Sequence, residues 1–141
     1  PNIESVNASF TYNNDDVTAI ADNRRPANSA DKSIPRWTSW PQLGKEQQVE
    51  IKLKKRMSIE SISVYWYNDN KGVKYPESWR AEYKTGDKWN KYIPYITDSY
   101  ATAGNQFNMV HPTAPVETDA IQLYITPQKD AAAGILEVII E

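Results

Sequence analysis

The chain has 141 residues, and its 16 lysines and arginines against 18 aspartates and glutamates give a formal net charge of −2. A nucleic-acid-binding surface would need a larger basic excess, and no apolar run is long enough to span a bilayer. The absence of cysteine excludes disulfides, thiolate catalysis and thiolate zinc sites. We therefore expect residues 1–141 to form a single module, cut from a longer polypeptide, whose partner is neither nucleic acid nor a membrane.

Apolar and polar residues alternate with a period of two along much of the chain, as in half-buried strands. In chain order, the predicted strands are residues 6–12, 49–53, 61–67, 79–84, 88–92, 107–111, 121–125 and 135–140. The last segment is apolar on both faces except at Glu137, so we expect it inside a sheet. No segment has the periodicity of a useful helix. About eight strands with long loops predict an all-β fold, an antiparallel jelly-roll β-sandwich.

Two local features refine this fold. Thr85-Gly86-Asp87 predicts a tight hairpin, because glycine adopts the positive φ that such turns need. The basic cluster 52–56 follows a predicted strand, and we expect it to line a solvated sheet edge. The predicted core consists of Ile51, Leu53, Ile62, Val64, Trp66, Leu123, Ile125, Leu136 and Val138.

The segment from Ser29 to Trp40 carries two tryptophans and is too irregular for a strand or a helix. A flat aromatic beside Arg36 and short hydroxyls suits a sugar, which offers an apolar face and many hydroxyl groups. We expect Trp37 to plug one end of the sandwich instead. For Trp40, which precedes Pro41, packing and sugar stacking both stay open.

More polar and aromatic residues follow the predicted strand 61–67, where side chains readily meet a ligand. We expect the loops after Asp31 and after Tyr67 to lie at one end of the sandwich. The predicted sugar-binding residues are Arg36, Trp40, Tyr67, Asp69, Asn70 and Tyr75.

Catalysis has little support in this sequence. His111 is the only histidine, which leaves no histidine cluster for a metal and no second imidazole for a proton relay, and we expect it to be structural. No nucleophile elbow, Walker loop or dinucleotide-binding glycine motif is present. A glycosidase pair among the 18 acidic residues stays open, because a sequence shows no distances.

A calcium site is better supported than an active site. Asp22 and Asn23 begin a long polar loop that also contains Asp31 and Ser33. Calcium is bound by carboxylates and backbone carbonyls, which such a loop supplies. Glu137 is a charge within an apolar strand, which is costly unless it is paired or metal-bound. It could close a metal site with Asp22, or it could face solvent or pair with a lysine or arginine.

Several short segments, taken in order, resemble the discoidin-like, galactose-binding-domain-like β-sandwich modules. They are Ala19–Asp22, Arg36–Trp37, Val64–Tyr67, Pro76–Trp79 and Ala133–Glu137. The stretch from Asn28 to Trp37 is similar to the accessory module of bacterial β-L-arabinofuranosidases and β-galactosidases. The resemblance covers residues 8–141, nearly the whole chain.

This resemblance implies an eight-stranded jelly roll, often with a structural calcium, that binds carbohydrate without catalysis beside a glycoside hydrolase. Carried onto this sequence, it implies that Asp22 and Glu137 hold the metal, with carbonyls around Asn23, Asp31 and Ser33. Many relatives have glycine where this chain has Asn23, but asparagine tolerates positive φ and can keep the turn. The sugar site does not transfer, because these modules vary their binding loops.

The sequence thus predicts a secreted or cell-surface bacterial module that tethers a glycoside hydrolase to a galactose- or arabinose-containing glycan. The catalytic domain of that enzyme would be its second partner. The alternative is a structural spacer that packs on the catalytic domain and has no sugar affinity. An exposed aromatic patch of Trp40, Tyr67 and Tyr75 would favour the first hypothesis, and two facing carboxylates in a cleft would favour an enzyme.

Overall fold

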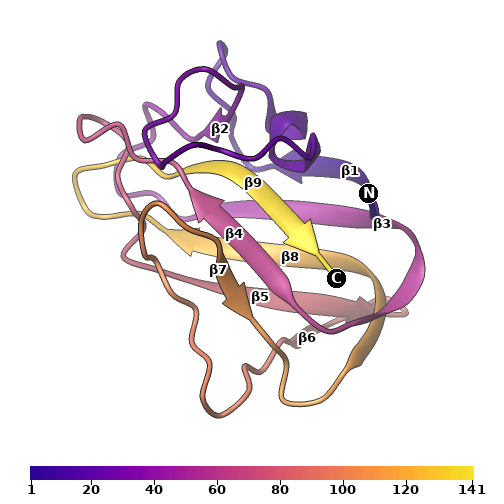
Figure 1. The fold of residues 1–141 in the computed structure, drawn as a ribbon. Helices are drawn as coiled ribbons and strands as arrows, with labels where there is room; N and C mark the ends of the chain where they lie inside the picture. Colours follow the sequence, from indigo (N-terminus) through magenta and orange to yellow (C-terminus); the bar gives the residue numbers. More distant parts are fainter.

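The computed structural model describes all residues 1–141 and confirms an all-β sandwich of two antiparallel sheets (Figure 1). In spatial order, the five-stranded sheet contains β1 (Ile3–Ala8), β3 (Gln47–Ile59), β8 (Val116–Thr126), β5 (Ser78–Thr85) and β6 (Lys88–Lys91). The four-stranded sheet contains β2 (Trp37–Thr38), β9 (Gly134–Ile140), β4 (Ile62–Trp66) and β7 (Asn108–Val110). One short 3₁₀ helix, η1 (Val17–Ala21), follows β1, and no helix is long and apolar enough to cross a membrane.

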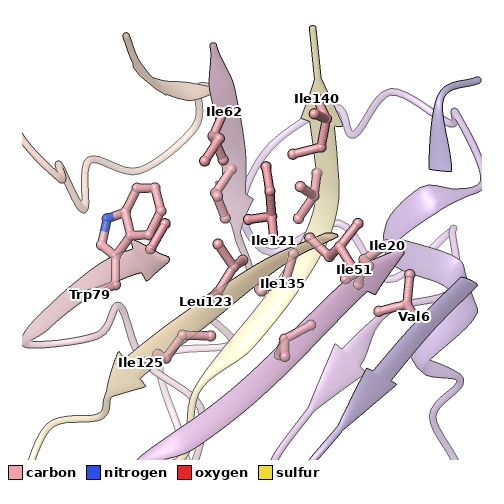
Figure 2. Close-up of a cluster of buried hydrophobic side chains, with 14 of the residues drawn as sticks. Val6, Ile20, Ile51, Ile62, Trp79, Ile121, Leu123, Ile125, Ile135 and Ile140 are labelled. Carbon is pink, nitrogen blue, oxygen red and sulfur yellow. The ribbon is translucent and has the colours of Figure 1, made fainter. Parts of the chain in front are cut away.

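The main core lies between the two sheets, because the alternating strands turn their apolar residues toward each other (Figure 2). All nine residues predicted for the core are buried. Eight of them belong to the main cluster, whereas Leu136 packs in a second cluster. The hairpin between β5 and β6 is also confirmed, and Gly86 adopts a φ of 59° at its turn.

The second cluster lies on the outer face of the four-stranded sheet and depends on a register shift. β4 pairs with β9 up to Tyr65–Glu137, and the next pair is Trp66–Ile135. Leu136 has no residue opposite it in β4, which makes a β-bulge in β9. Its side chain packs with Tyr65 and Tyr67 on the face opposite the main core. β9 lies between β2 and β4, so the expectation of an internal strand is confirmed.

Three expectations from the sequence were wrong. The segment 29–40 contains a two-residue strand, β2, which pairs with β9. The first predicted strand ends at Ala8 instead of residue 12. The basic cluster lies inside β3 instead of following a strand, and Lys52 pairs with both β1 and β8, whereas Lys54 to Arg56 are exposed. Its period-2 pattern is lost because the β3–β8 register shifts between Lys52 and Met57.

Two polar aromatic residues have structural roles, as expected. Trp37 is fully buried, and its indole N–H donates to the carbonyl of Phe10 at 2.9 Å, so it plugs the sandwich. His111 lies after β7, and both its backbone N–H and its ring Nδ1 contact Asp98 Oδ2, at 2.6 and 2.8 Å. Asp98 thereby joins the loop after β6 to the end of β7.

Candidate functional site

Loops that follow β1, β2 and β4 enclose a hollow of about 340 Å³ beside β2. Four of the six predicted sugar-binding residues line it: Arg36, Trp40, Tyr67 and Asp69. The sequence analysis missed the other lining residues, which include Tyr12, Asp15, Thr38, Lys71 and Gly72. The prediction that the loops after Asp31 and Tyr67 meet therefore agrees with the structure for these four side chains.

Trp40 provides the exposed aromatic surface of this hollow. The residue is 37 % exposed, while Tyr67 is only 4 % exposed and Tyr75 is partly buried against the main core. The indole lies against Gly72, where a Cβ atom added to the glycine would come within 2.0 Å of ring atom Cζ3. Gly72 therefore provides the space that the indole ring occupies, and of the three candidate aromatics only Trp40 can offer a ring face to a ligand.

Gly72→Ala should therefore displace the Trp40 ring, because the added carbon overlaps a rigid indole. The expected result is a changed chemical shift of the Trp40 indole N–H in a ¹H–¹⁵N NMR spectrum, with the other four tryptophans unchanged. Gly104→Ala is the matched control, since it crowds the Tyr75 hydroxyl instead. An unchanged Trp40 signal in Gly72→Ala would show that the ring does not lie over this glycine.

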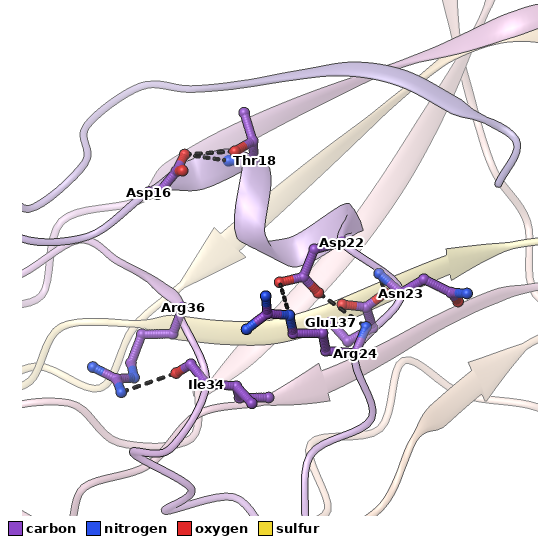
Figure 3. A network of polar contacts seen from close by, with 8 residues as sticks. All are labelled: Asp16, Thr18, Asp22, Asn23, Arg24, Ile34, Arg36 and Glu137. Atoms are coloured by element: carbon purple, nitrogen blue, oxygen red, sulfur yellow. Dashed lines mark hydrogen bonds and ion pairs between the residues drawn. The ribbon is translucent and has the colours of Figure 1, made fainter.

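Arg36 lies over the floor of the hollow. Its guanidinium carbon is 4.9 Å from the centroid of the Tyr67 ring, a cation–π geometry, and its Nη2 donates to the carbonyl of Ile34 at 3.1 Å (Figure 3). Burial raises the pKa of Tyr67, so this ring stays neutral beneath the cation. Arg36 Nε is buried and has no partner in the chain, while the half-buried side chain as a whole lines the hollow.

Two carboxyl groups complete the hollow. Thr38 Oγ1 donates to Asp15 Oδ2 at 2.5 Å, and burial raises the pKa of Asp15. Asp69 Oδ1 accepts the backbone N–H groups of Lys71 and Val73 at 2.8 and 3.0 Å, which fixes the loop after β4. Both carboxyl groups line the hollow, so each can serve as a hydrogen-bond acceptor for a ligand there.

Asn70 and Tyr75 lie in a neighbouring hollow of about 360 Å³. Its other lining residues are Ser29, Ala30, Asn68, Asp69 and Asn105. The six residues predicted to form one sugar site are thus divided between two hollows, and Asp69 lines both.

Glu137, one of the predicted metal ligands, is buried on the outer face of the four-stranded sheet beneath the loop after η1 (Figure 3). The backbone N–H of Asn23 donates to Glu137 Oε2 at 3.0 Å, while Oε1 is buried without a partner. Burial, together with the nearby carboxyl of Asp22, raises the pKa of Glu137 to about 8. Asn23 has a φ of 62°, so asparagine does keep the left-handed turn here.

The other two predicted ligands, Asp31 and Ser33, contact each other. Asp31 Oδ1 accepts the backbone N–H and the hydroxyl of Ser33 at 2.9 and 2.5 Å, and Oδ2 accepts the N–H of Ala27 at 2.8 Å. These hydrogen bonds, chiefly the one from Ala27, lower the pKa of Asp31. The side chain of Asp31 therefore stabilises its own loop, and no group of three or more acidic or histidine side chains forms a metal cluster.

The raised pKa of Glu137 predicts how the stability of the chelator-treated protein changes with pH. Its folded value of about 8 exceeds its ordinary value of 4.5, so the folded state binds this proton more tightly than the unfolded state. The resulting stabilisation is complete below about pH 4.5 and should be lost as the pH rises to about 8. Urea unfolding across this range measures it. Glu137→Gln should remove most of this slope, and an equal slope in both proteins would contradict the prediction.

The residues that the sequence analysis missed have no local signal. Asp15 and Thr38 are 23 positions apart, and neither belongs to a recognisable motif. They meet because β2 pairs with β9 and the loop after β1 lies across the same end of the sandwich. Only a correct prediction of the two-residue strand β2 would have placed Thr38 beside the hollow.

Three solved structures share this fold. A chain of the Streptococcus pneumoniae β-galactosidase BgaA superimposes with a TM-score of 0.76 at 21 % identity, covering 96 % of this chain and 89 % of that chain. The family 32 carbohydrate-binding module of C. perfringens NanJ, in complex with galactose, superimposes with a TM-score of 0.73 at 13 % identity. The match covers 96 % of this chain and 91 % of that chain. A chitosan-binding module of the Paenibacillus sp. IK-5 chitosanase/glucanase, in complex with chitotriose, superimposes with a TM-score of 0.70 at 15 % identity. The match covers 97 % of this chain and 95 % of that chain.

These TM-scores establish a common fold, and a family match confirms the resemblance to discoidin-like modules. The family model described as the F5/8 type C domain matches residues 5–138, which is nearly the whole sandwich. This chain therefore belongs to the F5/8 type C domain family.

Proposed function

We propose that this module binds carbohydrate in the hollow beside β2. The observation that carries the proposal is the exposed face of Trp40, which lies in a hollow also lined by the charged side chains of Arg36, Asp15 and Asp69. A sugar ring has an apolar face for the indole, and its hydroxyls both donate and accept hydrogen bonds. No other exposed tryptophan offers such a surface.

Each polar group has a distinct part in this proposal. The Arg36 guanidinium would donate to a ring or hydroxyl oxygen, and the carboxyl groups of Asp15 and Asp69 would accept hydroxyl protons. Thr38 and the backbone N–H groups of the β4–β5 loop hold these carboxyls in place before a ligand arrives. A sugar that lacks a matching hydroxyl would leave a group unpaired, at a cost of about 1–3 kcal/mol each.

The ligand that we propose first is a galactose- or arabinose-containing glycan. The module of NanJ with the same fold was solved with galactose, and the BgaA structure belongs to a β-galactosidase. We further propose that the module acts outside the cell and tethers a glycoside hydrolase to its substrate, by raising the enzyme's effective concentration there. The alternative remains a spacer that packs on the catalytic domain and does not bind sugar.

A glycan array probed with the isolated module tests this proposal. Selective binding to galactose- or arabinose-containing glycans is the expected result. Binding in affinity electrophoresis on a galactan gel would support it independently. If the module binds none of the plant, algal or host glycans offered, the carbohydrate-binding proposal fails and the spacer is favoured.

Glycoside hydrolysis is the second candidate, because the hollow contains two carboxyl groups and burial raises the pKa of one of them, Asp15. We do not expect Asp69 to act as a catalytic group, because its carboxylate already accepts two backbone N–H groups. Incubation with aryl β-galactoside and arabinofuranoside substrates separates the hypotheses. Turnover that Asp15→Asn abolishes would favour an enzyme.

We also propose that a calcium ion is held by Asp22 and Glu137, with carbonyl oxygens around Asn23, Asp31 and Ser33. The residues fit this ion, because Glu137 Oε1 is buried without a partner and the carboxyl of Asp22 lies close by. Calcium is bound by carboxylate and carbonyl oxygens, and the loop after η1 supplies both. Such an ion would fasten this loop to β9.

Calcium removal should lower the melting temperature of the module. A ligand that binds only the folded state stabilises it by RT ln(1 + [L]/Kd), which is about 2.7 kcal/mol at 100 times Kd. Thermal melts with added calcium and with chelator measure this difference. Glu137→Gln is the matched control and should melt alike in both. Equal melting of the wild type, after elemental analysis has shown that the metal is gone, would contradict the site.

A further inference from the structure

We propose that the neighbouring hollow around Asn70 is a second sugar subsite, so that the module binds a chain of at least two rings. This inference rests on the proposed carbohydrate binding at Trp40. The two hollows, of about 340 and 360 Å³, share Asp69 as a lining residue. A ring stacked on Trp40 and a ring in the second hollow would thus both lie against the same residue, Asp69.

The walls of the second hollow are tied together before any ligand binds. The backbone N–H of Ser29 donates to Asn105 Oδ1 at 2.9 Å, and the N–H of Asn105 donates to Ser29 Oγ at 2.8 Å. The N–H of Asn68 donates to the carbonyl of Ser29 at 2.9 Å, and the N–H of Asn70 donates to Asn68 Oδ1 at 2.7 Å. Three separate loops are thereby held in one arrangement, which reduces the entropy cost of binding.

Polar groups in this hollow remain available for a ligand. The carboxamide of Asn70, the Nδ2 atoms of Asn68 and Asn105, and the hydroxyl of Tyr75 have no partner in the chain. Carboxamides donate and accept hydrogen bonds, as sugar hydroxyls do. Tyr75 lies with its hydroxyl against Gly104, and no tryptophan lines this hollow, so it offers hydrogen bonds and no exposed indole. We expect it to add affinity to a ring already stacked on Trp40.

The charge of the second hollow indicates the class of ring that it accepts. Asp69 is the only charged residue among those that line it. A uronic acid placed there would bring a second negative charge beside Asp69, whereas a neutral or amino sugar would not. The structure therefore favours neutral or cationic sugars at the second position.

Isothermal titration with galactose and β-1,4-galactobiose, and in parallel with glucosamine and chitotriose, tests the second subsite. We expect about tenfold tighter binding of the longer ligand in at least one pair, as a few additional hydrogen bonds would give. Asn70→Gly removes the carboxamide while allowing the φ of 59° found there, and Tyr75→Phe removes only the hydroxyl. The double variant should bind the longer ligand no more tightly than the single sugar, and its affinity for the single sugar should stay unchanged.

Tyr95→Phe is the control, because Tyr95 is exposed and lines neither hollow. Equal affinity for single and longer sugars in the wild type would overturn the second subsite and leave the site at Trp40 intact. The same conclusion follows if the double variant, with an unchanged melt, keeps the full gain. If neither pair binds at all, the proposed carbohydrate binding fails for these sugars and the subsite fails with it.

Discussion

Trp66→Ala should lower the free energy of unfolding by about 3–5 kcal/mol, because it empties a large volume at the centre of the core. Trp66 is fully buried, and its ring meets that of Trp79 edge to face at a centroid distance of 5.5 Å. Its indole N–H also donates to the carbonyl of Ala101 at 3.3 Å. Trp79 donates to the same carbonyl at 2.8 Å, so the loop around Ala101 is held by both rings.

Urea unfolding of the wild type and the variant measures this loss. Trp89→Ala is the matched control, since Trp89 lies on the edge strand β6 and is only partly buried. We expect a clearly smaller loss there. If Trp66→Ala and Trp89→Ala cost the same free energy, Trp66 does not occupy the packed centre of the sandwich.

Trp40→Ala should abolish sugar binding and leave the melting temperature nearly unchanged. Trp40 is exposed and belongs to neither hydrophobic cluster, so its removal leaves both clusters intact. A shallow site depends on its stacking surface, and the loss of one aromatic–sugar contact removes most of the apolar area buried on binding. Affinity electrophoresis and a thermal melt on the same preparation measure the two effects.

Trp89→Ala again serves as the control and should retain binding, because Trp89 lines neither hollow. If Trp40→Ala unfolds, the indole is part of the packing and the proposed role is wrong. If the variant folds and binds sugar with wild-type affinity, the sugar site lies elsewhere on the sandwich.

The fold was largely predictable because its strands are half buried and alternate cleanly. The segment 121–125 carries this pattern and forms part of β8, and Gly86 marks the hairpin between β5 and β6. The alternation of apolar and polar residues gives no strand signal where strand pairing does not depend on it. β2 is two residues long, and β3 crosses a register shift between Lys52 and Met57. Neither feature leaves a periodic signal in the sequence.

The hollow was only partly predictable. Trp40 and Arg36 stand out by residue type, and Tyr67 and Asp69 stand out because they follow a strong strand. The division into two hollows depends on how the loops meet, through contacts such as Ser29 with Asn105, which are 76 positions apart. The exposure of each aromatic also depends on tertiary contacts: Tyr67 lies under Arg36, and Tyr75 packs against Gly104.

The most direct test of carbohydrate binding beside β2 is an NMR titration that follows the five tryptophan indole N–H signals. Galactose or chitotriose is added to ¹⁵N-labelled module, and Trp40→Phe identifies the Trp40 signal. We predict a saturable shift of that signal. We expect little change at Trp66 and Trp79, whose indole N–H groups donate hydrogen bonds to the carbonyl of Ala101. A saturable shift at Trp89 with none at Trp40 would contradict the site, and no shift at any indole would contradict binding of these sugars beside Trp40.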